Sequence, residues 1–312
     1  MTKQPEWVAP MLATLTETYF SDPNWIFERK LDGERVMTYV RRGEPRLYSR
    51  NQILLNGNYP ELVDAFAGCP DVIVDGEVVA FDGKQTSFAK LQPRMQTRNA
   101  TDARRSGVAV FYYVFDCLYA GRDDIRALPV RERKKRLRAT VDFADPLRFT
   151  THRVRDGEAY HDEACRKGWE GVIAKRAASP YASGRSRDWL KFKCVRDQEF
   201  VIGGFTDPQG SRAGFGALLV GYFDNGTLRY AGKVGTGYNS QLLRDLRAQL
   251  EKLEQDESPF ADRVREKGSH WVRPKVVAQV GFSEWTRDGK LRHPRFLGLR
   301  RDKKATEVVR ES

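Results

Sequence analysis

Short runs of apolar, β-branched and aromatic residues recur along most of the chain and limit the folds that it can adopt. They occupy residues 71–83, 107–119, 171–176 and 188–194. Runs of this kind, bounded by glycine and polar residues, are typical of strands that pair into sheets. None approaches the roughly 18 consecutive apolar residues that a membrane-spanning helix requires. The sequence therefore predicts a protein that is rich in β-structure and does not associate with a membrane.

A few helical segments lie between these runs. Residues 129–141 begin with a proline that suits the first turn of a helix, and their apolar residues recur at helical spacing. Residues 157–168 have a second helical pattern, which ends in Gly168, a residue suited to a helix C-terminus. Strands and helices together indicate a mixed α/β domain with largely antiparallel sheets.

The pattern changes after about residue 197. Residues 216–234 are predicted to form two strands around an Asp-Asn-Gly turn, and residues 275–296 to form two more around an Asp-Gly turn. Residues 240–255 repeat leucine at the spacing of one helical face. Several short strands with one helix are typical of a small barrel such as the oligonucleotide-binding (OB) fold.

These patterns predict an α+β chain of two domains. We expect a mixed α/β domain over residues 1–196 and an OB-fold β-barrel domain over residues 197–312. The boundary is placed near Arg196–Glu199, where the pattern of strand-like and helical residues changes.

The balance of charge points to a class of partner. The chain has 54 Lys and Arg residues against 42 Asp and Glu residues, a formal net charge of +12. A surplus of this size favours a polyanionic partner, with nucleic acid ahead of a membrane surface. The basic residues are spread along the chain, which indicates a folded basic face; basic residues that serve only solubility are the alternative.

The cysteines and the N-terminal residues indicate a cytoplasmic protein. Cys69, Cys117, Cys165 and Cys194 are far apart and lack a paired metal-ligand spacing. We therefore expect reduced thiols and no zinc site. The first residues also lack the long apolar segment of a secretory signal.

Residues 25–40, WIFERKLDGERVMTYV, combine a turn signal with charges beside it. Asp32-Gly33 lies between two apolar runs, and this arrangement predicts a β-hairpin. Taken alone, Lys30 is a solvated strand lysine next to a tight turn. A functional interpretation depends on the motifs that follow it.

Further motifs with the same mixture of strand-like and charged residues follow along the chain. Together they resemble the covalent nucleotidyltransferase superfamily, and within it the ATP-dependent DNA ligases. Among these ligases, the motifs are most similar to the ligase module of bacterial LigD-type repair ligases. The resemblance covers nearly the whole chain and implies a two-domain ligase core, either as a stand-alone enzyme or as a module of a larger protein. The motifs are KLDGER (30–35), SRN (49–51), DGEVVAFD (75–82), YVFD (113–116), EGVIAKR (170–176), WLKFK (189–193) and RHPRFLGLRRDK (292–303).

The resemblance implies three displacements at phosphorus. Lys30 attacks the α-phosphorus of ATP and forms a lysine–AMP phosphoramidate with loss of pyrophosphate. AMP then passes to a DNA 5′-phosphate, and the neighbouring 3′-hydroxyl displaces AMP to seal the strand. Positioning and charge neutralisation carry such reactions. Because lysine attacks as a neutral amine, nearby cations such as Lys191 and Lys193 are expected to help to deprotonate it.

The same resemblance implies the other site residues. Asp32 is expected to serve the later steps, and Gly33 to provide the backbone angles of the turn, although both have a turn-only alternative. Lys191 and Lys193 share a strand face with Trp189 by their period-two spacing. The implied catalytic set is Lys30, Asp32, Arg35, Lys191, Lys193 and Lys303.

A nucleotide-binding set and a metal site are also implied. Phe115 is expected to stack on adenine, with core packing as the alternative, and Arg35 and Arg50 to contact phosphate. Glu170, Asp32 and Glu77 are expected to hold Mg²⁺ or Mn²⁺, since such ions prefer oxygen ligands. The implied nucleotide-binding residues are Glu28, Lys30, Arg35, Arg50, Glu77, Phe115, Lys175, Lys191, Lys193, Arg300, Asp302 and Lys303.

In the second domain, the C-terminal motif is expected to orient the pyrophosphate that leaves in the first step. Its residues are Arg300, Asp302 and Lys303, and a solvated charged face is their alternative. This role implies that the domains close on ATP and reopen on DNA around a hinge at residues 194–199.

The resemblance also implies a setting. The expected substrate is nicked or broken double-stranded DNA, with Ku and an end-joining polymerase as candidate partners of a monomeric, nucleoid-associated enzyme. Two alternatives remain open: another covalent nucleotidyltransferase, either RNA-joining or GTP-using, and a non-catalytic nucleic-acid binding protein.

Overall fold

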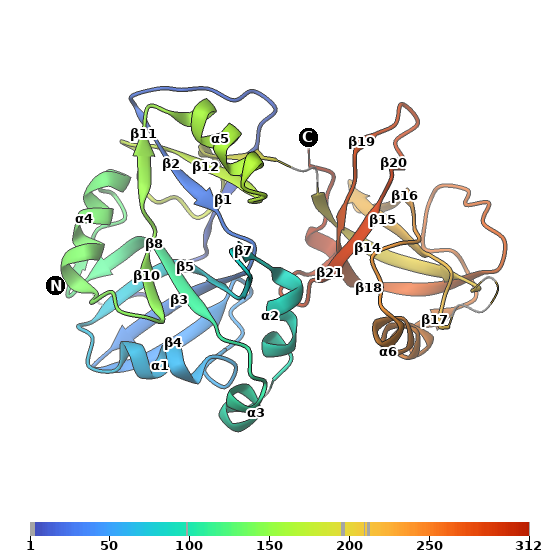
Figure 1. Ribbon diagram of the computed structural model, residues 1–312, viewed down its shortest axis with the longest axis horizontal. Helices are drawn as coiled ribbons and strands as arrows, with labels where there is room; N and C mark the ends of the chain where they lie inside the picture. Colours follow the sequence, from blue (N-terminus) through green and yellow to red (C-terminus); the bar gives the residue numbers. More distant parts are fainter. Residues whose placement is uncertain (1–3, 98, 195–196, 209, 211–212, 312) are drawn as a thin grey trace. The chain divides into compact units, whose positions relative to one another are not determined.

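The computed structural model describes residues 4–97, 99–194, 197–208, 210 and 213–311. The chain divides into two compact units, Met1–Cys194 and Val195–Ser312 (Figure 1). The predicted boundary residue Arg196 lies outside the described residues. Within the part of the chain that is described, no helix is long and apolar enough to cross a membrane.

The first unit is built on two sheets, which we call sheet A and sheet B. Most of their neighbouring strands are antiparallel, as predicted; the pairs β1–β13 and β8–β10 are parallel. Sheet A has the order β1 (Met11–Leu15), β13 (Gly184–Lys193), β12 (Gly171–Arg176), β2 (Trp25–Lys30) and β11 (His152–Val154). Sheet B has the order β10 (Leu147–Phe149), β8 (Phe111–Ala120), β5 (Val72–Val79), β3 (Glu34–Arg41) and β4 (Glu44–Ser49), with β9 (Asp123–Asp124) on β8 and a separate pair β6 (Phe81–Asp82) and β7 (Gln85–Thr86).

Helices cover the outer faces of these sheets. Val130 and Leu137 of α4 are fully buried, and the latter belongs to the core on the outer face of sheet B. Tyr160 and Ala164 of α5 pack against the outer face of sheet A. The helices of this unit are α1 (Pro60–Phe66), α2 (Phe88–Met95), α3 (Ala100–Arg105), α4 (Val130–Thr140) and α5 (Gly157–Arg166), and the last two confirm the predicted segments.

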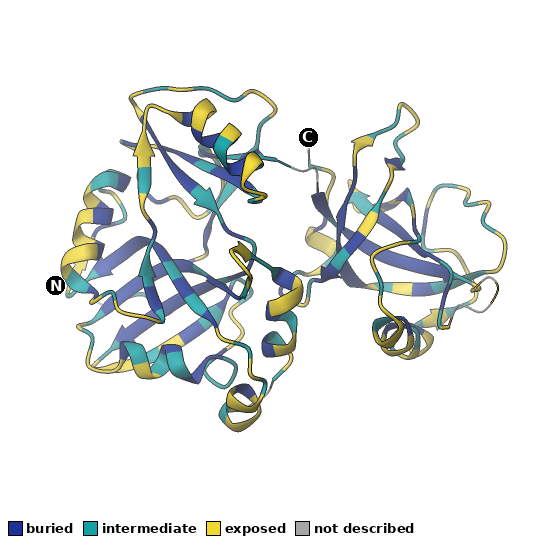
Figure 2. Ribbon diagram, viewed as in Figure 1, coloured by how far each residue is buried: buried dark blue, intermediate teal, exposed yellow. Residues whose placement is uncertain are grey.

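A third apolar cluster lies between the two sheets. Met37 and Ile73 belong to sheet B and Trp189 to sheet A, and all of them are buried in this one cluster. Figure 2 shows the strands of both sheets as largely buried and the outer helix surfaces as exposed. Both sheets are therefore covered on both faces, which agrees with the nearly continuous apolar runs in their sequences.

The predicted hairpin at residues 25–40 is wrong. Strand β2 pairs with β12 and β11 in sheet A, whereas β3 pairs with β4 and β5 in sheet B. The chain crosses from one sheet to the other at Asp32-Gly33. Residues on the two sides of this dipeptide therefore come from different sheets.

The role expected for Gly33 also needs correction. Its φ angle is not among the positive values of the chain, so the turn does not require the left-handed conformation there. Instead, a Cβ atom on Gly33 would lie 2.1 Å from the carbonyl oxygen of Val78 in β5. Glycine is required because the backbone of the crossing passes against a neighbouring strand.

The second unit is built on one antiparallel sheet, which we call sheet C. Its core includes Leu243, Leu246 and Leu250 of α6, which confirms the predicted leucine face. The order is β16 (Thr227–Val234), β15 (Leu218–Asp224), β14 (Asp197–Thr206), β18 (Ser269–Gly281) and β17 (Glu254–Gln255), with β21 (Arg295–Leu299) also on β18. Helix α6 (Ser240–Glu251), the pair β19 (Glu284–Trp285) and β20 (Leu291–Arg292), and a 3₁₀ turn (Ala305–Glu307) complete the unit.

The second unit contains the hairpins that the sequence predicts. Strands β15 and β16 pair up to Asp224 and Thr227, and the two residues between them have positive φ angles, 48° at Asn225 and 78° at Gly226. Strands β19 and β20 pair across the second predicted turn. Among the described residues the hydrogen-bonded path ends at β16 on one side, so the sheet is open and not a closed barrel.

The expectation of four reduced thiols is wrong for two of the cysteines. Cys165 on α5 and Cys194 after β13 form a disulfide, while Cys69 and Cys117 are free. Spacing in sequence gave no sign of this pair because the sheet, and not a local motif, brings the end of β13 to α5.

Candidate active site

The inner face of sheet A carries most of the charged residues that were predicted for the site. Side chains alternate along a strand, and residues that pair between neighbouring strands project to the same face. The predicted shared face of Lys191, Lys193 and Trp189 is present in β13. Across β2, β12 and β13 the face consists of the rows Lys30–Gly171–Lys193, Glu28–Ile173–Lys191 and Ile26–Lys175–Trp189.

Lys30 lies at the end of β2, where it forms an ion pair with Glu170 just before β12. The two side chains are only 16% and 14% exposed. A carboxylate at this position favours the charged form of the lysine, which opposes its use as a nucleophile. The expected cations, Lys191 and Lys193, lie in the same sheet, two strands away.

Glu28 is two residues before Lys30 and is buried between two lysines. Its carboxylate pairs with Lys134 of α4 and lies 2.7 Å from Nζ of Lys175 in β12. Burial by itself raises the pKa of Glu28, but the two lysines outweigh burial and hold its pKa below the usual value of 4.5. Burial, reinforced by Lys134 and opposed by Glu28, lowers the pKa of Lys175.

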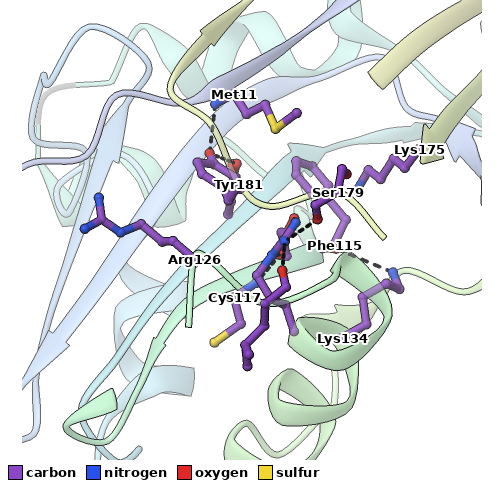
Figure 3. Close-up of polar contacts among 12 residues, drawn as sticks. Met11, Phe115, Cys117, Arg126, Lys134, Lys175, Ser179 and Tyr181 are labelled. Atoms are coloured by element: carbon purple, nitrogen blue, oxygen red, sulfur yellow. Dashed lines mark hydrogen bonds and ion pairs between the residues drawn. The ribbon is translucent and has the colours of Figure 1, made fainter. Parts of the chain in front are cut away.

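Lys134 is held in place by more than this carboxylate. Its ammonium group donates to the carbonyl oxygen of Thr150 at 2.8 Å. It also donates to the carbonyl oxygen of Phe115 at 3.5 Å (Figure 3). The Glu28 carboxylate therefore has a fixed position and a fixed charge, which suits it to accept hydrogen bonds from a ligand.

Aromatic rings border this charged group. Nζ of Lys175 lies 4.1 Å from the ring centroid of Trp189 and 4.4 Å from that of Phe115. The guanidinium of Arg35 lies 4.5 Å from the Phe115 ring, and Phe115 is 9% exposed. Phe115 is thus a member of the core between the sheets, and its stacking on adenine stays a prediction.

Arg35 reaches the site from sheet B and is anchored by Asp75. Its guanidinium forms a two-pronged pair with the buried carboxylate and donates to the carbonyl oxygen of Met11 at 3.1 Å. Burial opposes the charge on Arg35, but Asp75 prevails and raises its pKa. Tyr181 donates to the same carboxylate and accepts the backbone N–H of Met11 at 2.9 Å (Figure 3).

The other predicted residues of this unit are less closely grouped. Glu77 pairs with Arg35 in the register of sheet B, on the side that faces sheet A. The carboxylate of Asp32 accepts the backbone N–H of Phe88 at 3.1 Å, at the start of α2, which gives it a structural role in the crossing. Arg50 follows β4 at the edge of sheet B and is half-buried.

The C-terminal motif forms a separate cluster within the second unit. Arg300 donates both prongs of its guanidinium to Asp302 at 2.9 and 2.7 Å, and Lys303 lies 3.0 Å from Glu199 of β14. Asp302 is buried; burial raises its pKa, but Arg300 outweighs burial and lowers it. The three predicted residues are therefore brought together, with Glu199 as an addition.

Several residues of these networks were missed from the sequence. Lys134 lies in a basic run of α4, and it differs from its exposed neighbour Lys135 only in being buried. A signal was available, because Lys134 is four residues after Val130 and so lies on the apolar face of its helix. Asp75 and Tyr181 had no such signal, since their contacts join segments far apart in the chain.

The donor sets suit a nucleotide and a hard cation. Glu170, Glu77 and Asp32 carry carboxylate oxygens of the kind that Mg²⁺ prefers, but in the described part of the chain these three are not grouped around one point, so their metal site stays a prediction. The lysines and Arg35 supply charge for phosphate, with Arg35 held in a fixed orientation by Asp75. The arrangement can neutralise a polyphosphate beside a lysine amine, which is what transfer of a nucleotidyl group to that lysine requires.

Comparison with known proteins identifies the family. Residues 10–193 match the ATP-dependent DNA ligase domain, and residues 211–303 match the ATP-dependent DNA ligase C-terminal region. The multifunctional non-homologous end joining protein LigD of Pseudomonas aeruginosa is 41% identical over 99% of this chain and 37% of its own length. The corresponding Mycobacterium bovis protein is 38% identical over 97% of this chain and 40% of its own length. The chain thus spans well under half of these relatives.

Solved structures agree with the sequence comparison. A mycobacterial DNA ligase D complexed with ATP is 35% identical, with a TM-score of 0.70, over 97% of this chain and 98% of that one. The ligase domain of Mycobacterium tuberculosis LigD is 36% identical, with a TM-score of 0.51, over the same shares. The predicted two-domain ligase core and its use of ATP with a divalent metal are confirmed, and the RNA-joining, GTP-using and non-catalytic alternatives are not favoured. The chain therefore belongs to the family of ATP-dependent DNA ligases.

Proposed function

We propose that this chain seals breaks between a 3′-hydroxyl and a 5′-phosphate in double-stranded DNA, through a lysine–AMP intermediate and a DNA-adenylate, as the ligase part of an end-joining system. The observation that carries the proposal is the face of sheet A on which Lys30, Lys191 and Lys193 project together beside Glu170. A lysine nucleophile with cations for a triphosphate is the minimum that the first step needs.

In this proposal, Lys30 accepts AMP. Lys191 and Lys193 neutralise the phosphates, and Arg35, oriented by Asp75, holds a phosphate oxygen through the part of its guanidinium that is not paired. The ion pair with Glu170 favours the charged form of Lys30. Lys30 becomes reactive when the charge of Glu170 is engaged elsewhere.

A divalent metal is assigned to three carboxylates of this unit. Glu170, with Glu77 and Asp32, would hold Mg²⁺ or Mn²⁺, which supplies positive charge at the phosphates when bound. The carboxylate of Asp32 also accepts a hydrogen bond from the start of α2, so its orientation is set before any ligand binds.

The base of ATP is assigned to the buried group around Glu28. Its carboxylate is an acceptor held by Lys134 and Lys175, and an exocyclic amino group is the complementary donor. Phe115 is assigned to stacking on adenine, and Arg50 to a phosphate contact at the break.

In the second unit, Arg300, Asp302 and Lys303 are assigned to the pyrophosphate that leaves in the first step. The predicted hinge at residues 194–199 and the domain boundary at 196/197 belong to this proposal. The enzyme acts as a monomer in the cytoplasm on nucleoid DNA, and Ku and an end-joining polymerase are its proposed partners. The net charge of +12 supports a DNA substrate.

The first test is covalent labelling. Purified protein is mixed with ATP labelled at the α-phosphate and Mg²⁺, and the label is followed on a denaturing gel. Wild type is expected to become labelled, and Lys30→Ala is expected to lose the label. Lys135→Ala, which removes a 73% exposed lysine, is the matched control and should label normally. Label that persists on Lys30→Ala would assign the nucleophile to another lysine.

The second test separates the roles of the two units. Lys303→Ala is expected to slow self-adenylylation much more than the sealing of a nick that already carries AMP, because pyrophosphate leaves only in the first step. Lys304→Ala, an exposed neighbour, is the control. Equal losses in both assays would remove the leaving-group role from Lys303.

A further inference from the structure

A cluster of sulfur and imidazole ligands lies outside the proposed active site. It consists of His161 and Cys165 on α5 and Cys194 after β13, whose ligand atoms all lie within 4.8 Å of one another. Cys194 continues the alternation of β13 on the side of Phe192, whereas Lys191 and Lys193 project to the other side. The cluster is therefore separated from the proposed phosphate-binding face by the sheet itself.

We propose that these three side chains form a binding site for Zn²⁺ when the disulfide is reduced. Nε2 of His161 already lies 3.4 Å from Sγ of Cys165, close to the separation of two ligand atoms that share one tetrahedral zinc ion. Thiolate sulfur and imidazole nitrogen select zinc over the hard cations that carboxylates bind.

The helix places two of the ligands in advance. His161 and Cys165 are four residues apart and so lie on one face of α5, the spacing at which a helix offers two ligands to one metal. His161 is 7% exposed. Its Nδ1 lies 3.9 Å from the carboxylate of Asp162, too far for a hydrogen bond, and its Nε2 lies 3.3 Å from the carbonyl oxygen of Lys193.

The third ligand comes from the end of the sheet, and the surroundings close the site. The backbone N–H of Cys194 donates to the carbonyl oxygen of Glu170 at 3.1 Å, which holds the residue beside α5. The Tyr19 ring covers His161 with ring centroids 3.9 Å apart, and its hydroxyl donates to the carbonyl oxygen of Lys193 at 3.0 Å. With three protein ligands, a fourth position remains for water.

The disulfide and the metal site are alternative states of the same two sulfurs. A dithiol reductant delivers two electrons and two protons to the Cys165–Cys194 bond, which yields two thiols and the disulfide of the reductant. Zn²⁺ then displaces the two thiol protons as it binds. In both states the last residue of the first unit stays cross-linked to α5, so reduction in the presence of Zn²⁺ does not release the end of β13.

The test is competition for Zn²⁺ between the whole chain and a chromogenic chelator. Protein reduced with a phosphine and stripped of metal is expected to take up one more Zn²⁺ per chain than protein with the disulfide intact. Cys165→Ser, Cys194→Ser and His161→Gln should each weaken binding by roughly 100-fold or more. Cys69→Ser and His293→Gln, which alter residues outside the cluster, should bind as wild type does.

Two further measurements keep the test independent of how the variants fold. Co²⁺ added to reduced wild type should produce the near-ultraviolet sulfur-to-cobalt charge-transfer band, and this band should be absent from the oxidised protein. His161→Cys, which restores a zinc ligand, should recover most of the affinity that His161→Gln loses. Equal Zn²⁺ uptake by oxidised and reduced protein, or uptake that does not depend on Cys165 and Cys194, would overturn the proposal.

Discussion

Two dipeptides of this chain that end in glycine both predict a β-hairpin from the local sequence, but only one of them forms a hairpin. Asn225-Gly226 joins β15 to β16 in a hairpin, with both residues at positive φ. Asp32-Gly33 instead takes the chain from sheet A to sheet B, and its glycine is not at positive φ. Two apolar runs around such a dipeptide predict that the chain turns there, but not that the runs pair with each other.

The difference lies in what each glycine contacts. A Cβ atom on Gly226 would meet no atom within 4 Å, so only the local backbone conformation requires glycine there. A Cβ atom on Gly33 would meet β5, and the neighbouring Asp32 is bound to the start of α2. Contacts with distant segments therefore hold the crossing, and these outweigh the local preference for a hairpin.

This crossing matters for the proposed function. It places Lys30 at the end of β2 in sheet A and Arg35, only five residues later, near the start of β3 in sheet B. The Arg35 guanidinium then lies 5.9 Å from the Trp189 ring of the facing sheet. A hairpin would have placed the two cations in one sheet, whereas the crossing places them in two facing sheets.

The largest expected effect concerns the charge buried just before the crossing. Glu28→Gln leaves Lys134 and Lys175 without their shared carboxylate, and we expect the first unit to lose about 4 kcal/mol of unfolding free energy at neutral pH. Urea titration measures this loss. Glu132→Gln, in an exposed pair on α4, is the control and should change stability by less than about 0.5 kcal/mol.

The same variant has a defined pH dependence. Because the pKa of Glu28 lies below 4.5 in the folded protein, its contribution is fully present above pH 4.5 and is lost as the pH falls through the lowered pKa. The stability difference between wild type and Glu28→Gln should therefore shrink under acid conditions. A difference that stays constant down to low pH would contradict the charged state assigned to Glu28.

The second prediction tests the crossing directly. In Gly33→Ala the new methyl group would clash with the backbone carbonyl of Val78, which cannot rotate away as a flexible side chain could. The backbone must therefore shift, and we expect the free energy of unfolding to fall by about 3 kcal/mol. The displacement also moves Lys30, so self-adenylylation should slow by roughly 100-fold. Both quantities are measured on the same preparation, by urea titration and by the labelling gel.

The third prediction concerns the anchor on the far side of the crossing. Asp75→Asn removes the charge that holds Arg35, and we expect the free energy of unfolding to fall by about 2 kcal/mol. This is less than for a fully buried pair because the Arg35 side chain is 18% exposed and keeps its bond to Met11. Nick sealing should fall as Arg35 loses its orientation, whereas Asp64→Asn, in an exposed pair, should seal normally.

The smallest effect is expected at the hairpin. Gly226→Ala places a side chain at a φ angle of 78°, but its methyl group would meet no neighbouring atom. We therefore expect the free energy of unfolding to fall by about 1 kcal/mol and self-adenylylation to stay unchanged. Gly226→Asn should recover part of that loss, because asparagine tolerates the left-handed region. The comparison between the two turns fails if Gly226→Ala costs as much as Gly33→Ala.

Some of the site could be predicted without the structure because its pattern is local. Period-two spacing was enough to place Lys191, Lys193 and Trp189 on one face of a strand. The network around Glu28 could not be predicted in this way, since Lys134 and Lys175 come from elements more than 100 residues further along the chain. The Cys165–Cys194 disulfide was missed for the same reason.

The sequence by itself determined the family, the helices α4, α5 and α6, the turn positions and the order of the charged motifs. These depend on residue identity and on short-range periodicity, which are present in any stretch of chain. Only the tertiary structure decided that β2 and β3 belong to different sheets, that Glu170 pairs with Lys30, and that Cys165 meets Cys194. Such pairings are set by burial and by backbone hydrogen bonds between distant strands, and these energies exceed what a dipeptide at a turn can impose.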